Sequence, residues 1–279
     1  GDIYFKATAP ALAHELALTE ALARWRPDCI PEVLALDLER AWMLMPDVGA
    51  SLRSLIRVDR DLGHWHRVLP LYAELQIEVA GHLGELLALG VPDRRLSLLP
   101  GQYESLLADT EAVRIGLAGG LTPEEYRRLR ELAPRFAALC GELADYNIPE
   151  SLDHNDLHDG NIFVRDGRYV FADWGDACAA HPFFSLLVTL VSVVNALGLE
   201  EHAPEMAVLR DVYLEPWTRF ESRENLLAAF ALAQQAAMVC RALTWQMAVV
   251  RTEEGQREEH AGRVPAWLQE FLKAESAED

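Results

Sequence analysis

The sequence has few cysteines, and they stand far apart. They are Cys29, Cys140, Cys178 and Cys240, and no two of them form a Cys-x-x-Cys pair. Structural zinc sites and small disulfide frameworks use cysteines at close and regular spacings. The sequence therefore predicts neither kind of site. The pattern is typical of a protein that stays reduced, and we expect a cytoplasmic one.

Basic residues are also scarce. The chain has 25 Lys and Arg against 44 Asp and Glu, which gives a formal net charge of −19. Nucleic-acid surfaces need a basic stripe, so we expect no nucleic-acid partner. An acidic cleft would concentrate a cationic small molecule. Solubility alone is the simpler explanation of the charge.

Long apolar runs and a leader peptide are not evident either. No apolar run approaches the roughly 20 residues that a membrane span needs. The first residues, "GDIYFKA", have neither the basic start nor the apolar core of a signal peptide. We therefore expect no membrane association. The 279 residues suit one large domain or two small ones, and 51% hydrophobic residues supply a core.

Two kinds of pattern divide the chain. Residues 2–6 predict a strand. Thr8 predicts a helix cap, with Pro10 in the first turn of a helix that runs to Trp25. Residues 33–37 and 41–45 predict a hairpin. This part ends near Gly49. Helical periodicity follows over residues 51–58, 64–89, 101–113, 122–146, 182–197, 204–214, 223–252 and 264–275. Residues 151–173 are the exception and predict short strands with a turn at Asp166–Gly167.

Polar residues gather at the ends of these short strands, in "HNDLHDGN" (154–161) and "ADWGDA" (172–177). The short loop from Asp156 to Asn161 can bring both side chains to one side. Asp173 follows a strand that can pair with 162–164, which brings it close to Asn161. Such oxygen donors suit Mg²⁺, whereas a zinc site at His154 and His158 would lack its other ligands. With Asn161 and Asp173 on the metal, Asp156 is left as a base, as phosphoryl transfer requires.

These motifs carry a resemblance. His154, Asp156 and Asn161 in "HNDLHDGNIFV", followed by "DWG" at 173–175, resemble the aminoglycoside phosphotransferase family, which shares the protein-kinase-like fold with choline kinases. The resemblance implies a bilobal α+β fold, with a small β-rich lobe at 1–49 and a large, mainly helical lobe at 50–279. It also implies ATP, with GTP still open, and Mg²⁺. The expected activity is transfer of the γ-phosphate to a hydroxyl of a small molecule, an aminoglycoside or another cationic alcohol.

The resemblance also implies roles for single residues. Asp156 is the catalytic base, His154 braces its loop, and Asn161 and Asp173 are magnesium ligands. In such kinases a strand Lys pairs with a Glu of the next helix, and Lys6 in "IYFKA" matches that Lys.

Two further binding positions are expected in the first 50 residues. Helical geometry favours Glu15 over Glu20 as the partner of Lys6, because Glu15 falls within the buried arc of its helix. The strand before "MPDVG" resembles the hinge between lobes, so Met45 to Asp47 are expected to meet the adenine through backbone groups. Met43 is expected in the core.

The sequence also departs from the family pattern. Lys6 comes too early for the two strands and glycine-rich loop that should precede it, so we expect an incomplete N-terminus rather than a lost cover. Asp159 replaces a Pro and is expected to add a charge beside the metal. Ser185 replaces an Asp that often braces the fold, which predicts a local rearrangement. His181 is expected to shape the turn before Pro182.

The acceptor pocket is expected among the later helices. They carry an acidic set that suits a cationic alcohol, although a solvated helix face explains it equally well: Glu200, Glu201, Glu205, Asp211 and Glu215. Trp217, Phe220 and Trp245 are expected in the core. The alternative is a catalytically silent, kinase-like binding protein, which the missing glycine-rich loop favours. The presence of Lys6, Asp156, Asn161 and Asp173 opposes it.

Overall fold

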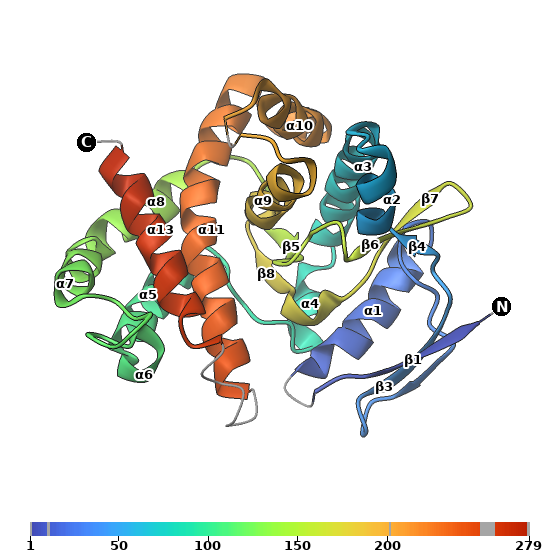
Figure 1. The fold of residues 1–279 in the computed structure, drawn as a ribbon, viewed down its shortest axis with the longest axis horizontal. Coiled ribbons are helices and arrows are strands. Elements are labelled where there is room, and N and C mark those ends of the chain that lie inside the picture. Colours follow the sequence, from blue (N-terminus) through green and yellow to red (C-terminus); the bar gives the residue numbers. More distant parts are fainter. Residues whose placement is uncertain (1, 10–11, 201, 252–259, 278–279) are drawn as a thin grey trace. The chain divides into compact units, whose positions relative to one another are not determined.

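The structure is a computed structural model that describes residues 2–9, 12–200, 202–251 and 260–277. Figure 1 shows its elements in chain order. They form two compact units, one of Gly1–Asp93 with Ile148–Leu226 and one of Arg94–Asn147 with Leu227–Asp279. The lobe boundary near residue 49 lies inside the first unit and stays a prediction.

The first sheet is antiparallel, with β3 (Trp42–Pro46) between β1 (Ile3–Ala7) and β2 (Ala35–Asp37). The predicted hairpin is therefore confirmed, and Asp37 Oδ1 closes its turn by accepting from the Arg40 N–H at 3.0 Å. Met43 is 2% exposed and packs with Leu16 of α1 (His14–Trp25). As predicted, Met43 is a core residue.

Helix α1 begins later than its sequence predicts. Its first residue is His14, and the preceding Ala13 makes no side-chain cap. Thr8 instead extends the β1–β3 ladder, donating its N–H to the Ala41 carbonyl at 2.9 Å. The predicted cap at Thr8 is therefore wrong, because backbone pairing holds Thr8 in the sheet. Pro10 lies outside the described residues.

Two small sheets carry the polar motifs. One sheet has the strand order β4-β6-β7 and consists of β4 (Ala50–Ser51), β6 (Ile162–Arg165) and β7 (Arg168–Phe171). In the other sheet, β5 (Ser151–Asp153) pairs with β8 (Cys178–Ala180). The predicted turn at Asp166–Gly167 is confirmed. Its φ angles are +52° and +76°, and two positive values are what a two-residue hairpin turn of type I′ requires.

Helices complete the first unit, and two of the predicted ones are divided. The predicted helix 64–89 is α3 (Gly63–Ala80) and α4 (Leu83–Ala88), separated at Gly81. Residues 182–197 form the 3-10 helix η3 (Pro182–Ser185) and then α9 (Leu186–Leu197). The others are α2 (Leu52–Asp59), α10 (Pro204–Leu214), and the 3-10 helices η2 (Trp174–Asp176) and η4 (Glu215–Arg219).

The second unit is helical in its described part. It contains α5 (Leu99–Ala108), α6 (Thr110–Val113), α7 (Pro123–Glu131), α8 (Ala133–Ala144), α13 (Arg263–Ala277) and most of α11 (Arg223–Arg251). A capping box of Thr122 and Glu125 starts α7. Tyr103, Phe136 and Phe271 form its aromatic core, with Tyr103 and Phe136 centroids 4.9 Å apart.

Helix α11, orange in Figure 1, corrects one expectation. Its residues Arg223–Val249 are long and apolar enough to cross a membrane by length and composition, and an 18-residue window within them has a mean hydropathy of 1.5. The sequence suggested that no segment came near that length. However, 67% of this window is buried, and the core helix of a globular protein meets the same test. One such helix is weak evidence for a membrane span.

Candidate active site

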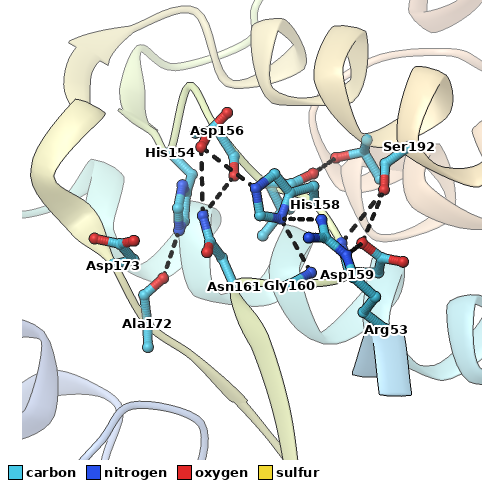
Figure 2. A network of polar contacts seen from close by, with 12 residues as sticks. Arg53, His154, Asp156, His158, Asp159, Gly160, Asn161, Ala172, Asp173 and Ser192 are labelled. Atoms are coloured by element: carbon cyan, nitrogen blue, oxygen red, sulfur yellow. Dashed lines mark hydrogen bonds and ion pairs between the residues drawn. The ribbon is translucent and has the colours of Figure 1, made fainter. Parts of the chain in front are cut away.

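The loop 154–161 connects β5 to β6, and His154 fixes its start (Figure 2). His154 is fully buried. Its Nε2 donates to the Ala172 carbonyl at 3.0 Å, and its ring lies 4.5 Å from that of Trp174. Its backbone N–H donates to the Tyr72 hydroxyl at 3.1 Å. His154 therefore ties the loop to the residues on both sides of Asp173.

Asp156 and Asn161 lie side by side, as the loop length predicts. Asn161 Nδ2 donates to the backbone carbonyl of Asp156 at 3.0 Å and lies 3.5 Å from its Oδ2. These contacts fix the amide, because only its nitrogen can donate. Its Oδ1 is then directed away from Asp156, as Figure 2 shows. The amide oxygen is thus presented to a ligand.

Asp173 follows β7 in a strained conformation. Its φ of +67° lies in the left-handed region, which residues other than glycine rarely adopt. The preceding residue, Ala172, donates its N–H to the Asn161 carbonyl at 3.0 Å, so the pairing of β6 and β7 brings Asp173 beside Asn161. The Asp173 side chain is 57% exposed. It is open to a ligand on the same side as Asn161.

Lys6 connects α1 to Asp173. Its Nζ contacts Glu15 and lies 2.7 Å from Asp173 Oδ1. Glu15 is 2% exposed and also accepts from the Thr8 hydroxyl at 3.1 Å, whereas Glu20 is exposed. The structure thus forms the pair that helical geometry favoured.

The charges in this group stabilise one another. Burial works to lower the pKa of Lys6, but Glu15 and Asp173 outweigh it and raise the pKa above its usual value. Burial works to raise the pKa of Asp173, but Lys6 holds it below the usual range. Lys6 is therefore a cation and Asp173 an anion at neutral pH.

One cavity of about 400 Å³ brings the predicted binding residues together. Met45 and Asp47 line it with Lys6, Asn161 and Asp173. The backbone of Asp47 is already engaged, since its N–H donates to the Asp2 carbonyl at 3.0 Å and its own carbonyl accepts from Arg165. Met45 has no partner in β2, which pairs only as far as Leu44.

The donors around this cavity fit Mg²⁺. Asn161 and Asp173 offer amide and carboxylate oxygens, which are hard ligands, and neither a thiolate nor an imidazole lines it. The Lys6 ammonium already lies against Asp173, so this carboxylate is in a place where positive charge is stabilised. The residues present therefore fit a magnesium ion better than zinc.

Comparisons with known proteins identify the family of the chain. A model of the phosphotransferase enzyme family, APH, matches residues 3–221. The chain belongs to this family. A search of curated proteins found no significant match.

Solved structures with the same fold are small-molecule kinases. A choline/ethanolamine kinase family protein from Mesorhizobium loti has a TM-score of 0.61 at 15% identity, covering 98% of this chain and 83% of its own. The Plasmodium vivax ethanolamine kinase Pv091845 has a TM-score of 0.59 at 15% identity, covering 98% and 77%. The structure of APH(2")-IIia with GDP and kanamycin has a TM-score of 0.60 at 15% identity, and the match covers 99% of this chain and 88% of that one. The phosphotransferase therefore has the α+β kinase-like fold.

Asp159 does not add its charge to the metal side. It is 3% exposed, and its Oδ1 accepts from Arg53 Nε at 2.8 Å, with Ser192 Oγ at 3.4 Å on the other side. Figure 2 shows Asp159 turned toward Arg53 and away from Asp173. The negative charge that Asp159 was expected to add is offset by the guanidinium of Arg53, which α2 supplies.

Ser185 is part of a buried hydrogen-bond network that includes Asp153. Its hydroxyl donates to Asp153 Oδ1 at 2.6 Å and meets the Tyr72 hydroxyl at 2.7 Å. Asn155 donates to the same carboxylate through its N–H at 2.8 Å and its Nδ2 at 2.9 Å. Burial raises the pKa of Asp153, and these donors only partly offset it. The carboxylate of this network comes from Asp153, which directly precedes His154, and the rearrangement expected from Ser185 stays a prediction.

Sequence reasoning missed three residues of the site. Asp153 had a signal, since it is a carboxylate in a buried strand directly before the loop. Tyr72 and Arg53 had none, because each reaches the loop from a helix more than 80 residues earlier in the chain.

His181 shapes its turn as predicted. Its Nδ1 accepts from the Phe183 N–H at 3.3 Å, and burial lowers its pKa to about 3. It is therefore neutral and caps η3.

The expected acceptor residues are mostly solvated. Glu200, Glu205 and Glu215 are exposed, and Glu201 lies outside the described residues. Asp211 pairs with Arg210 and Arg223. Trp217 is fully buried beside Phe183, 5.4 Å between centroids, as expected of a core residue.

Proposed function

We propose that the phosphotransferase is a kinase that moves the γ-phosphate of ATP to a hydroxyl of a small molecule, with Mg²⁺ as cofactor. One observation carries the proposal. Lys6, Asn161 and Asp173 come from separate segments and line one cavity, and Asp156 lies directly beside Asn161. The GDP named in one structural neighbour supports a nucleotide at this place. GTP remains the competing donor.

Asp156 acts as the base. Its carboxylate orients the acceptor hydroxyl and takes its proton as the oxygen forms a bond to the γ-phosphorus. The bond between that phosphorus and its bridging oxygen breaks, and the nucleoside diphosphate leaves with the bonding electrons. Asp156 then returns the proton to solvent. Positioning and charge stabilisation supply most of the rate.

The other residues hold the nucleotide. Asn161 Oδ1 and the Asp173 carboxylate would hold Mg²⁺, which when bound neutralises phosphate charge. Lys6, fixed by Glu15, binds phosphate oxygens. The backbone of Met45 meets the adenine, with Asp47 shaping the cavity beside it. His154 holds the loop in register.

The acceptor is a small alcohol. The neighbours named above are an ethanolamine kinase, a choline/ethanolamine kinase family protein and a kanamycin-bound enzyme. The net charge of −19 adds a general attraction for a cationic alcohol. The cysteines are free and buried, so we place this kinase in a reducing compartment, the cytoplasm.

Calorimetric titration with Mg²⁺–ATP and Mg²⁺–GTP tests the proposal, with choline, ethanolamine and kanamycin as acceptors. Asp156→Asn should lower turnover by about 10²- to 10⁴-fold and leave nucleotide affinity nearly unchanged. Asp173→Ala should weaken Mg²⁺–nucleotide binding as well. Asp166→Asn is the matched control, since Asp166 is an exposed carboxylate with positive φ in the nearby hairpin turn.

One result would decide against the kinase, and a second would decide against Asp156 as its base. If no nucleotide binds, the chain is a silent binding protein. Full turnover by Asp156→Asn would show that another group is the base.

A further inference from the structure

Arg53, in the first turn of α2, holds the loop at three points. Its backbone N–H donates to the Asp159 carbonyl at 2.8 Å, and its Nε donates to Asp159 Oδ1 at 2.8 Å. Its Nη2 lies 3.3 Å from His158 Nδ1. Because β4 pairs with β6 directly before α2, the backbone of Arg53 is itself fixed against this loop. Figure 2 shows the guanidinium beside the imidazole.

These contacts determine the tautomer of His158. A guanidinium has only N–H donors, so the Nδ1 that faces it must accept. The Gly160 backbone N–H also points at Nδ1, at 3.0 Å, and it too can only donate. Two donors on one nitrogen exclude a proton there. In the neutral ring the proton is then on Nε2, which lies 3.5 Å from Asp156 Oδ2.

Gly160 shows how closely these groups approach. A Cβ at this position would lie 2.8 Å from His158 Cε1 and 2.9 Å from Arg53 Cζ. No side chain fits between the two without moving one of them. The chain therefore has its smallest residue at the point where Arg53 and His158 meet.

We propose that Arg53 is a positioning residue for the reaction. It fixes His158 as a donor through Nε2, and His158 in turn orients the carboxylate of Asp156. The inference rests on the proposed function, in which Asp156 is the base. A separation of 3.5 Å is long for a hydrogen bond, and such contacts often tighten when substrate binds. One carboxylate oxygen is then held by His158, and the other faces the acceptor hydroxyl.

A double-mutant cycle tests the link. The probe is hydrolysis of Mg²⁺–ATP, in which water is the acceptor, so the natural acceptor is not needed. Arg53→Ala should lower kcat by about 10- to 100-fold and leave KM for ATP within about twofold. Arg57→Ala is the matched control, since Arg57 lies one turn later in α2, exposed, and should change neither.

The cycle distinguishes an effect of Arg53 that acts through His158 from one that does not. In the His158→Asn background, Arg53→Ala should cost almost nothing more, because the donor that Arg53 fixes is already gone. Fully additive effects would show that Arg53 acts independently of His158 and would overturn the inference. Equal melting temperatures confirm that the variants are folded.

Two substitutions of His158 examine the donor itself. Gln places its amide near Nε2 and can still donate to Asp156, whereas Asn reaches only the place of Nδ1. His158→Gln should therefore retain clearly more kcat than His158→Asn. Equal loss in both would contradict a donor role for Nε2.

Nitrogen NMR of the His158 ring gives a readout that does not need activity. We expect the Nε2–H tautomer in the wild type and a mixture in Arg53→Ala. An Nδ1–H tautomer in the wild type would overturn the inference, even if the kinase is confirmed. Absence of nucleotide binding together with the Nε2–H form would instead locate the failure in the proposed function.

Discussion

A buried carboxylate decides how Lys6 can act. Glu15 is 2% exposed, contacts Lys6 and accepts from Thr8, while Asp173 takes the other side of the ammonium. With Glu15 in place, the cation is shared between two carboxylates. Without it, Lys6 would pair with Asp173 alone and compete with the Mg²⁺ that we propose at this carboxylate.

Glu15→Gln should therefore affect both stability and binding. We expect a loss of about 1–3 kcal/mol in the free energy of unfolding, since a charge-assisted hydrogen bond is weakened. Affinity for Mg²⁺–ATP should fall about tenfold. Urea denaturation and calorimetry measure the two. Glu20→Gln, on the exposed face of the same helix, should change stability by less than about 0.5 kcal/mol.

His181 should make the protein sensitive to acid. Its pKa is about 3 in the folded state, where burial disfavours the charge, against an unfolded value near 6.5. Between these values the unfolded chain binds one more proton. Stability is therefore fully present above pH 6.5 and decreases as the pH falls toward 3, by at most about 1.4 kcal/mol per pH unit.

His181→Asn keeps an acceptor for the Phe183 N–H but does not titrate. Melting curves between pH 7 and 4 should show a shallower acid loss than the wild type, even if Asn is less stable at neutral pH. His66→Asn, an exposed site, should keep the wild-type slope. Identical slopes for all three would mean that His181 is not the group that titrates.

At the scale of the element, the strand β4 is held to β6 by a close approach. Gly49 has a φ of +93°, and a Cβ there would lie 2.2 Å from the Val164 carbonyl oxygen. The contact is with backbone, so no side chain can move to relieve it. Only glycine permits the chain to pass from β3 into β4 at this point.

Gly49→Ala should destabilise the protein by about 2–4 kcal/mol through backbone strain and overpacking. Chemical denaturation measures it. Gly84→Ala in α4 is the control, because nothing lies within 4 Å of its new methyl group, and it should be neutral or stabilising by up to about 1 kcal/mol. A neutral result for Gly49→Ala would show that β4 is free to leave β6.

The periodicity of the apolar residues and the residue types at turns predicted most of the helices and strands. The hairpin at 33–45 and the turn at 166–167 follow from local residues, so they were predictable. Helix breaks inside 64–89 and 122–146 were not, because Gly81 and Leu132 interrupt the helices without breaking the apolar pattern. The loop residues of the site were visible as a motif. Arg53 was not, because its contacts with His158 and Asp159 join positions more than 100 residues apart.

At the scale of the whole molecule, the net negative charge should make stability depend on salt. The net charge is −19, so the excess acidic side chains repel one another in the folded state, and added salt screens this repulsion. Raising NaCl from about 0.01 M to about 1 M should raise the melting temperature by several degrees. KCl should act equally, since the effect is one of ionic strength. A fall in the melting temperature would show that ion pairs such as Arg127 with Glu124 and Glu131 outweigh the repulsion.

Lys6 is one of only two lysines in the sequence, and the other is Lys273. Lys273 is 71% exposed on α13 and pairs with one carboxylate, Glu270, whereas Lys6 is 30% exposed and enclosed by two carboxylates that limit the access of a reagent to its amine. An acylating reagent should modify Lys273 quickly and Lys6 slowly. Mass spectrometry of two peptides would then follow the chemistry of the site. Because lysine is scarce, modification of Lys6 reports on the site of this phosphotransferase, and modification of Lys273 serves as the internal standard.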